Sequence, residues 1–125
     1  MKILVLEDDP QRHKVFKRNL IGSEYKIVET AEDCIACLKE SSWSVLFLDH
    51  DLGGKQMVES GPGTGYEVAE WISKNPDQGP NEIVLHTFNP SGAKNMQRVL
   101  GDVPWLPGCW SGIRVKDGKL FIDLR

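Results

Sequence analysis

The chain has 125 residues, 40% hydrophobic and 26% charged, which is the composition of one ordinary globular domain. Fifteen Lys and Arg against eighteen Asp and Glu leave a net charge of -3, so we expect no strong nucleic-acid-binding surface and no membrane partner. No apolar stretch approaches the roughly 18 residues of a membrane span and no signal-peptide pattern is present, so we expect a cytoplasmic protein with reduced cysteines.

Short apolar runs rich in β-branched residues alternate with stretches of helical periodicity along the first 100 residues. The predicted elements are, in chain order, strand 2–6, helix 10–21, strand 25–29, helix 31–38, strand 44–49, loop 52–64, helix 65–75, strand 82–87, helix 90–100 and hairpin 113–122. Capping residues followed by proline mark two helix starts, and Asp117-Gly118 predicts the hairpin turn. This order indicates one α/β domain, residues 1–125, with a doubly wound, mainly parallel sheet and a C-terminal β-hairpin.

Acidic residues stand at the ends of two of these strands. Residues 7–9 (Glu-Asp-Asp) follow the first strand, and residues 49–51 (Asp-His-Asp) follow the third. Right-handed crossovers bring the carboxyl ends of parallel strands to one edge, where ligands bind. Crowded carboxylates resist ionising unless a cation joins them. We therefore expect Mg²⁺ as the cofactor, held by Glu7, Asp8 and Asp49.

The fourth strand and the helix after it add phosphate-binding candidates at the same edge. This strand ends in His86 and Thr87, and the next helix begins with Asn89-Pro90-Ser91-Gly92. Free N–H groups and the dipole favour an anion at a helix N-terminus, so Thr87, Asn89, Ser91 and Gly92 are predicted to bind phosphate. For Asn89, a role as a helix cap alone is the simpler alternative.

The predicted catalytic residues are Asp49, His50, Asp51, His86 and Thr87. Asp49 is the candidate nucleophile, and Asp51 could add a metal ligand or act as a base. A histidine titrates near neutral pH, so His50 or His86 could pass a proton to a leaving oxygen. A buried hydrogen-bonding role is an equal alternative for His50.

Residues 3–9 (Ile-Leu-Val-Leu-Glu-Asp-Asp), together with Leu48-Asp49 and Thr87, resemble the response-regulator receiver family over about residues 1–100. The resemblance implies a flavodoxin-like fold, an aspartyl phosphate at Asp49 and a switch role for Thr87. Receivers carry a lysine at the end of a fifth parallel strand and a fifth helix after it, and neither is found here. Residues 48–52 and 86–92 are more similar to a divergent branch, the cyclic-phosphate processing receiver domains, which implies action on cyclic phosphate ends.

Three functions follow. The preferred one is Mg²⁺-dependent processing of a phosphoester, a cyclic phosphate on a small molecule or a nucleic-acid end, motivated by the two histidines, Asp51 and the missing lysine. The second is a phosphoacceptor receiver in a phosphorelay, phosphorylated on Asp49 by a histidine kinase. The third is a degenerate receiver that only binds another protein, for which the apolar surface from Trp105 to Trp110 could serve.

Overall fold

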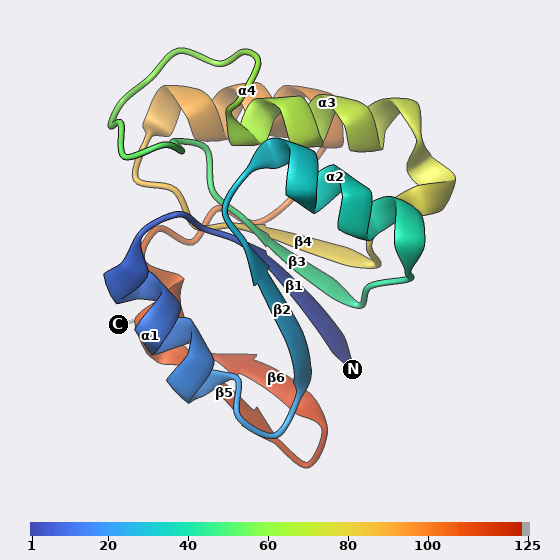
Figure 1. Cartoon of the computed structure of the whole chain (residues 1–125), viewed down its shortest axis with the longest axis vertical. Helices are drawn as coiled ribbons and strands as arrows, with labels where there is room; N and C mark the ends of the chain where they lie inside the picture. Colours follow the sequence, from blue (N-terminus) through green and yellow to red (C-terminus); the bar gives the residue numbers. More distant parts are fainter. Residues whose placement is uncertain (124–125) are drawn as a thin grey trace.

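A parallel sheet forms the centre of the computed structural model, which describes residues 1–123 (Figure 1). Its strands are β1 (Lys2–Leu6), β2 (Glu24–Val28), β3 (Val45–Leu48) and β4 (Glu82–Leu85), in the spatial order β2-β1-β3-β4. All pairings between these strands are parallel. The four carboxyl ends therefore share one edge, as the alternation of elements predicts.

Helices cover one face of this sheet, and a helix with a hairpin covers the other (Figure 1). The remaining elements are α1 (Pro10–Asn19), α2 (Ala31–Glu40), α3 (Gly65–Lys74), η1 (Pro76–Gln78), α4 (Pro90–Leu100), η2 (Cys109–Gly112), β5 (Ile113–Lys116) and β6 (Lys119–Ile122). Helices α2, α3 and α4 lie on one side, whereas α1 and the β5–β6 hairpin lie on the other. The predicted doubly wound α/β fold with a C-terminal hairpin is confirmed.

Alternation along the strands divides the core into two layers. Leu4 and Leu6 of β1 pack toward α2, α3 and α4, while Ile3 and Val5 pack toward α1 and the hairpin. Successive side chains of a strand point to opposite faces, so each strand serves both cores. The same parity continues past the strand ends and decides the side on which Glu7 lies.

The C-terminal segment contributes a single fifth position to the sheet. Trp105 forms an isolated parallel bridge with Leu85 of β4. The Leu85 N–H donates to Pro104 O (2.9 Å), and the Leu106 N–H donates to Leu85 O (2.8 Å). Prolines flank this bridge and lack an N–H, so the pairing cannot extend into a longer strand. A single bridge residue therefore takes the place of a fifth strand, which the sequence did not predict.

The β5–β6 hairpin turns at the predicted dipeptide. Asp117 and Gly118 both have positive φ, 53° and 72°, which a two-residue type I′ turn requires. Ile113, Val115 and Leu120 pack into the α1 side of the core, so the hairpin covers the sheet face next to α1. Within residues 1–123, no helix has the length and apolar character needed to cross a bilayer.

Candidate functional site

Glu7, Asp49 and His86 form a row across the carboxyl edge of the sheet. The register pairs the last residues of β1, β3 and β4, so the residues just beyond them are neighbours. The Asp49 N–H donates to Leu6 O (3.3 Å), and the His86 N–H donates to Leu48 O (3.1 Å). One side-chain atom from each of the three lies within 4.8 Å of the others, and all three residues are buried. We call Glu7, Asp49 and His86 the rim cluster.

Glu7 is held ionised inside this cluster. Its Oε1 atom lies 3.1 Å from His86 Nε2, and the His86 ring packs edge-on against Phe16 and Trp110. Burial by itself would raise the pKa of Glu7. The hydrogen bond and positive charge of His86, with the Arg12 guanidinium nearby, outweigh burial and lower this pKa to about 2.

Asp49 behaves in the opposite way. Its side chain is almost fully buried, and its Oδ1 atom accepts the backbone N–H of His50 at 2.8 Å. Burial and the negative charge of Glu7 raise the pKa of Asp49 to about 6, although His86 and Arg12 act to lower it. A cation placed between Glu7 and Asp49 would reduce the repulsion between the two carboxylates and favour the ionised form of Asp49.

The rim cluster fits a divalent cation. Two carboxylates and an imidazole are common ligands for such ions. Atoms bound at about 2.1 Å from one ion lie about 3 to 4 Å apart, so a spacing of up to 4.8 Å needs only small side-chain movements. His86 Nδ1 is also the single buried side-chain polar atom without a hydrogen-bond partner in residues 1–123. The imidazole of His86 therefore contacts Glu7 through Nε2 and keeps Nδ1 without a hydrogen-bond partner.

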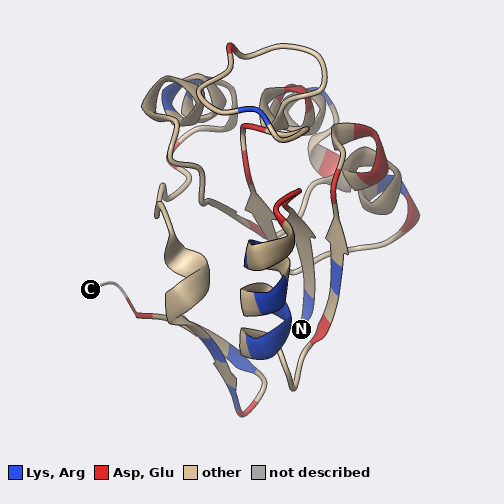
Figure 2. Cartoon of the chain, turned by 60° about the vertical axis from the view of Figure 1, so that its left-hand side comes forward, with Lys and Arg blue, Asp and Glu red and all other residues tan. Residues whose placement is uncertain are grey.

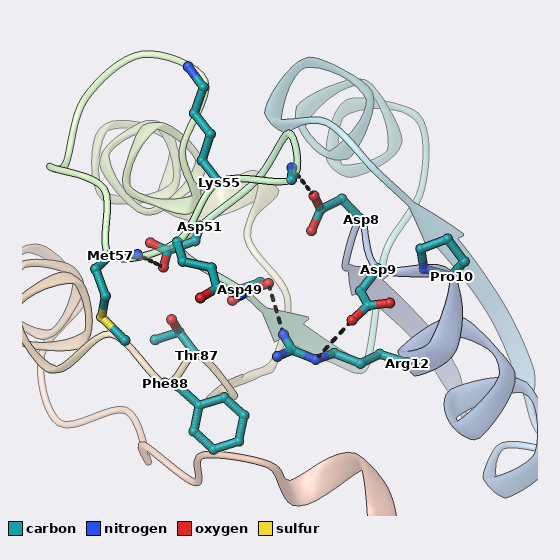
Figure 3. Close-up of a pocket in the computed structure, with 12 residues that line it drawn as sticks. Asp8, Asp9, Pro10, Arg12, Asp49, Asp51, Lys55, Met57, Thr87 and Phe88 are labelled. Atoms are coloured by element: carbon teal, nitrogen blue, oxygen red, sulfur yellow. Dashed lines mark hydrogen bonds and ion pairs between the residues drawn. The ribbon is translucent and has the colours of Figure 1, made fainter.

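A pocket of about 390 Å³ has Asp49 of the rim cluster in its wall (Figure 3). Its polar lining comprises Asp8, Asp9, Arg12, Asp49, Asp51, Gly54, Lys55, Gln56 and Thr87, and its apolar lining comprises Pro10, Met57 and Phe88. Asp49 belongs to both the rim cluster and the pocket wall. A molecule in the pocket would therefore meet Asp49 before it met the other cluster residues.

Asp8 lies at the pocket wall, outside the rim cluster. Its Oδ2 atom accepts the backbone N–H of Gly54 at 2.7 Å, which ties the loop after β3 to the loop after β1. The structure thus brings Glu7 and Asp49 together as predicted metal ligands, and His86 in place of Asp8 completes the cluster. Strand parity could have indicated this, because His86 is the first residue after its strand, as Glu7 and Asp49 are after theirs.

His50 does not line the pocket, and its side chain lies in a polar network. Its Nδ1 lies 2.7 Å from Asp51 Oδ1, and its Nε2 lies 2.8 Å from Ser60 Oγ. A Cβ atom added to Gly92 of α4 would lie 2.4 Å from the ring, so α4 packs directly on His50. With both ring nitrogens engaged, His50 is a positioning residue for Asp51.

Asp51 itself reaches the pocket in ionised form. Partial burial acts to raise its pKa, but hydrogen bonds from Asn89, His50 and the Met57 N–H lower the pKa below its usual value. Asn89 Nδ2 donates to Asp51 Oδ1 at 3.0 Å and also to Val58 O at 3.0 Å. This network joins the loop after β3 to the start of α4.

Of the predicted phosphate-binding residues, Thr87 reaches the pocket. Its Oγ1 atom accepts the Asn89 N–H at 3.1 Å, which leaves the hydroxyl hydrogen able to point to a ligand. Asn89 Oδ1 caps α4 by accepting the Gly92 N–H at 3.0 Å. Ser91 is exposed, and neither it, Asn89 nor Gly92 lines the pocket. The side-chain oxygen of Asn89 therefore acts as the helix cap that the simpler alternative predicts.

Arg12 is the main site residue that sequence reasoning missed. Its Nη1 atom lies 3.4 Å from Glu7 Oε1 and 3.8 Å from Asp49 Oδ2, and its Nε lies 3.6 Å from Asp9 Oδ2 (Figure 3). Figure 2 shows the acidic loop after β1 directly beside the first turn of α1. A basic residue in the first turn of a helix that starts at an acidic strand end is the signal that could have indicated it.

Comparisons with known proteins identify the family and the fold of this chain. The sequence profile of the family described as the cyclic-phosphate processing receiver domain matches residues 2–102. No curated protein sequence matches the chain.

Two solved structures similar to the chain are a response regulator and a signal receiver domain. The Mn²⁺-bound form of response regulator Rcp1 is 22% identical over 85% of this chain and 79% of its own, with a TM-score of 0.67. The signal receiver domain of a putative Luxo repressor protein from Vibrio parahaemolyticus is 22% identical over 86% and 77% of the two chains, with a TM-score of 0.66. At such identities these structures show a shared fold. The profile match over residues 2–102 shows that this chain belongs to the cyclic-phosphate processing receiver domain family.

Proposed function

We propose that the protein opens a cyclic phosphate in a reaction that depends on Mg²⁺ at the rim cluster. The observation that carries this proposal is the buried rim cluster, whose ligand atoms lie within 4.8 Å of one another beneath a pocket lined by Asp51 and Thr87. A volume of about 390 Å³ suits a small phosphate-bearing molecule or the end of a longer one.

The bound ion would neutralise phosphate oxygens and orient the phosphorus for in-line attack. Asp49, which forms part of the pocket wall, attacks the phosphorus and forms an aspartyl phosphodiester. The bond to one ring oxygen breaks, and that oxygen leaves as an alkoxide that takes a proton from solvent water and becomes a hydroxyl group. Thr87 donates its hydroxyl hydrogen to a phosphate oxygen. Asp51, ionised and held by His50 and Asn89, takes a proton from the water that then hydrolyses the aspartyl intermediate. His50 thus positions Asp51, while His86 contacts Glu7 and would be the third ligand of the ion.

Incubation of the protein with 2′,3′-cyclic nucleotides and Mg²⁺ tests the proposal. We expect ring-opened monophosphates, detected by ³¹P NMR, that disappear on chelation and in Asp49→Asn. Asp77→Asn, which removes one exposed carboxylate far from the pocket lining, is the matched control. Absence of turnover across a panel of cyclic phosphates with Mg²⁺ or Mn²⁺ would refute the proposal.

A phosphoacceptor receiver is the second candidate. It is favoured by the receiver fold and by the position of Asp49 beside Thr87 in one pocket. In that case acetyl phosphate with Mg²⁺ would add one phosphoryl group to the intact protein, and Asp49→Asn would abolish the added mass. A histidine kinase would then be the natural partner. A folded protein with no affinity for divalent metal would instead support a role in protein binding alone.

A further inference from the structure

Arg12 lies between the carboxylates of the rim cluster and two aromatic rings. Its guanidinium carbon is 4.5 Å from the centre of the Trp110 ring and 5.4 Å from that of Phe88. On the other side, its Nη1 is 3.4 Å from Glu7 and 3.8 Å from Asp49. The Arg12 side chain is 28% exposed and lines the pocket. The guanidinium is thus held in one place without being sealed from a ligand.

The pocket needs a positive charge at this position. Its lining contains four aspartates, and its basic side chains are those of Arg12 and Lys55. In Figure 3 the Lys55 side chain extends away from the carboxylates, whereas Arg12 points toward Asp49. Within residues 1–123 the guanidinium makes one hydrogen bond, to Glu7 at 3.4 Å, so several of its five N–H donors remain available.

The C-terminal segment builds the support for this arginine. Trp110 belongs to η2, and its backbone oxygen accepts a hydrogen bond from Asn19 Nδ2 at 2.7 Å, which joins η2 to the end of α1. Next to β4, the single fifth position of the sheet is occupied by Trp105, which carries no charge. The positive charge beside Glu7 and Asp49 therefore comes from Arg12 of α1.

We infer that Arg12, seated on the Trp110 ring, binds the phosphoryl oxygens of the substrate. Without a ligand it acts as the counter-ion of Glu7 and Asp49, and when a cation binds there the guanidinium turns its free donors to the phosphoryl group. A planar guanidinium can contact two phosphoryl oxygens at once, which an ammonium cannot. This inference rests on the proposed function, because it names the residue that holds the phosphoryl group in that reaction.

Calorimetric titration tests this assignment, first with Mg²⁺ and then with beryllofluoride in saturating Mg²⁺. Arg12→Gln should bind Mg²⁺ at least as tightly as the wild type, because a competing positive charge is gone. It should bind beryllofluoride about tenfold or more weakly, the usual effect of losing a charged hydrogen bond. Arg18→Gln removes an exposed arginine from the same helix and should match the wild type.

Two further variants separate binding from structural support. Arg12→Lys keeps the charge and loses the planar fork, so its beryllofluoride affinity should lie between those of the wild type and Arg12→Gln. Trp110→Leu keeps the arginine and removes the aromatic ring that supports its guanidinium. This change should also weaken beryllofluoride binding, with little change in Mg²⁺ affinity. If Arg12→Gln does not fold, these two variants decide the question.

Two results would overturn the role of Arg12. One is beryllofluoride binding to the folded Arg12 variants at wild-type affinity. The other is an equal loss of Mg²⁺ and beryllofluoride affinity, which is expected if Arg12 only orders the carboxylates. Failure of the wild-type protein to bind Mg²⁺ or beryllofluoride is a different outcome, because it refutes the proposed phosphoryl chemistry itself.

Discussion

The Asp49 carboxyl group should destabilise the metal-free fold at neutral pH. Its pKa is raised from 3.8 to about 6, mainly by burial and then by the charge of Glu7. Asp49→Asn keeps the shape of the side chain and the acceptor for the His50 N–H, but removes the charge. We therefore expect the variant to be more stable than the wild type when no divalent metal is present.

The magnitude follows from proton linkage. Above pH 6 Asp49 is ionised in both the folded and the unfolded state, and the folded state bears the cost of the buried charge. At about 1.4 kcal/mol per pH unit, the separation between 3.8 and about 6 corresponds to at most about 3 kcal/mol. As the pH falls below about 6 the folded protein takes up the proton, so the advantage of Asp49→Asn shrinks and vanishes below about pH 4.

Thermal unfolding followed by circular dichroism, with chelator, at pH 7.5 and at pH 4 measures this effect. About 1 kcal/mol moves the Tm of a domain of this size by about 4 °C, so the variant should melt up to about 12 °C higher at pH 7.5. Added Mg²⁺ should stabilise the wild type more and narrow the gap. Asp77→Asn controls for net charge. An Asp49→Asn variant that melts at or below the wild-type temperature at pH 7.5 would refute the reasoning.

Three further predictions concern the scaffold. Gly65→Ala should unfold at lower denaturant concentration and lose Mg²⁺ affinity, because the new Cβ would lie 1.7 Å from Asp49 O. Gly61→Ala, where the new Cβ has open space, should leave the stability and the Mg²⁺ affinity unchanged. Asn89→Ala removes the cap of α4 and the bonds to Asp51 and Val58, so it should cost about 1 to 2 kcal/mol in chemical denaturation and speed proteolysis within residues 52–64; unchanged cleavage would contradict this role. Burial raises the pKa of Cys109 to about 12, so this thiol should resist a disulfide reagent at pH 8 until the protein unfolds, and rapid native labelling would be inconsistent with the structure.

Local sequence signals specified most of the architecture. Asp9, Thr30 and Asn89 accept hydrogen bonds from the first turns of their helices, as their positions predicted. Right-handed crossovers place the carboxyl ends of all parallel strands at one edge of the sheet. Glu7 and Asp49 are therefore expected at the same edge once the two strands before them are correctly predicted. These signals are short-range, and the topology follows from their order.

The roles of individual side chains at the site were less predictable. His50 and His86 have similar positions in the sequence, because each lies at or just after the end of a strand. In the structure, His50 contacts Asp51 under α4, whereas His86 contacts Glu7 beside Trp110. Strand parity separates them, but only when the last paired residue of each strand is known. A shift of one residue in a strand boundary exchanges the two faces.

The sequence by itself determined the α/β alternation, the hairpin at Asp117-Gly118 and the collection of acidic residues at one edge, because periodicity, caps and turns act over a few residues. Only the tertiary structure decided that Arg12 sits among those carboxylates. That placement depends on η2, which packs Trp110 against α1 from about 90 residues farther along the chain, a contact that no local pattern encodes.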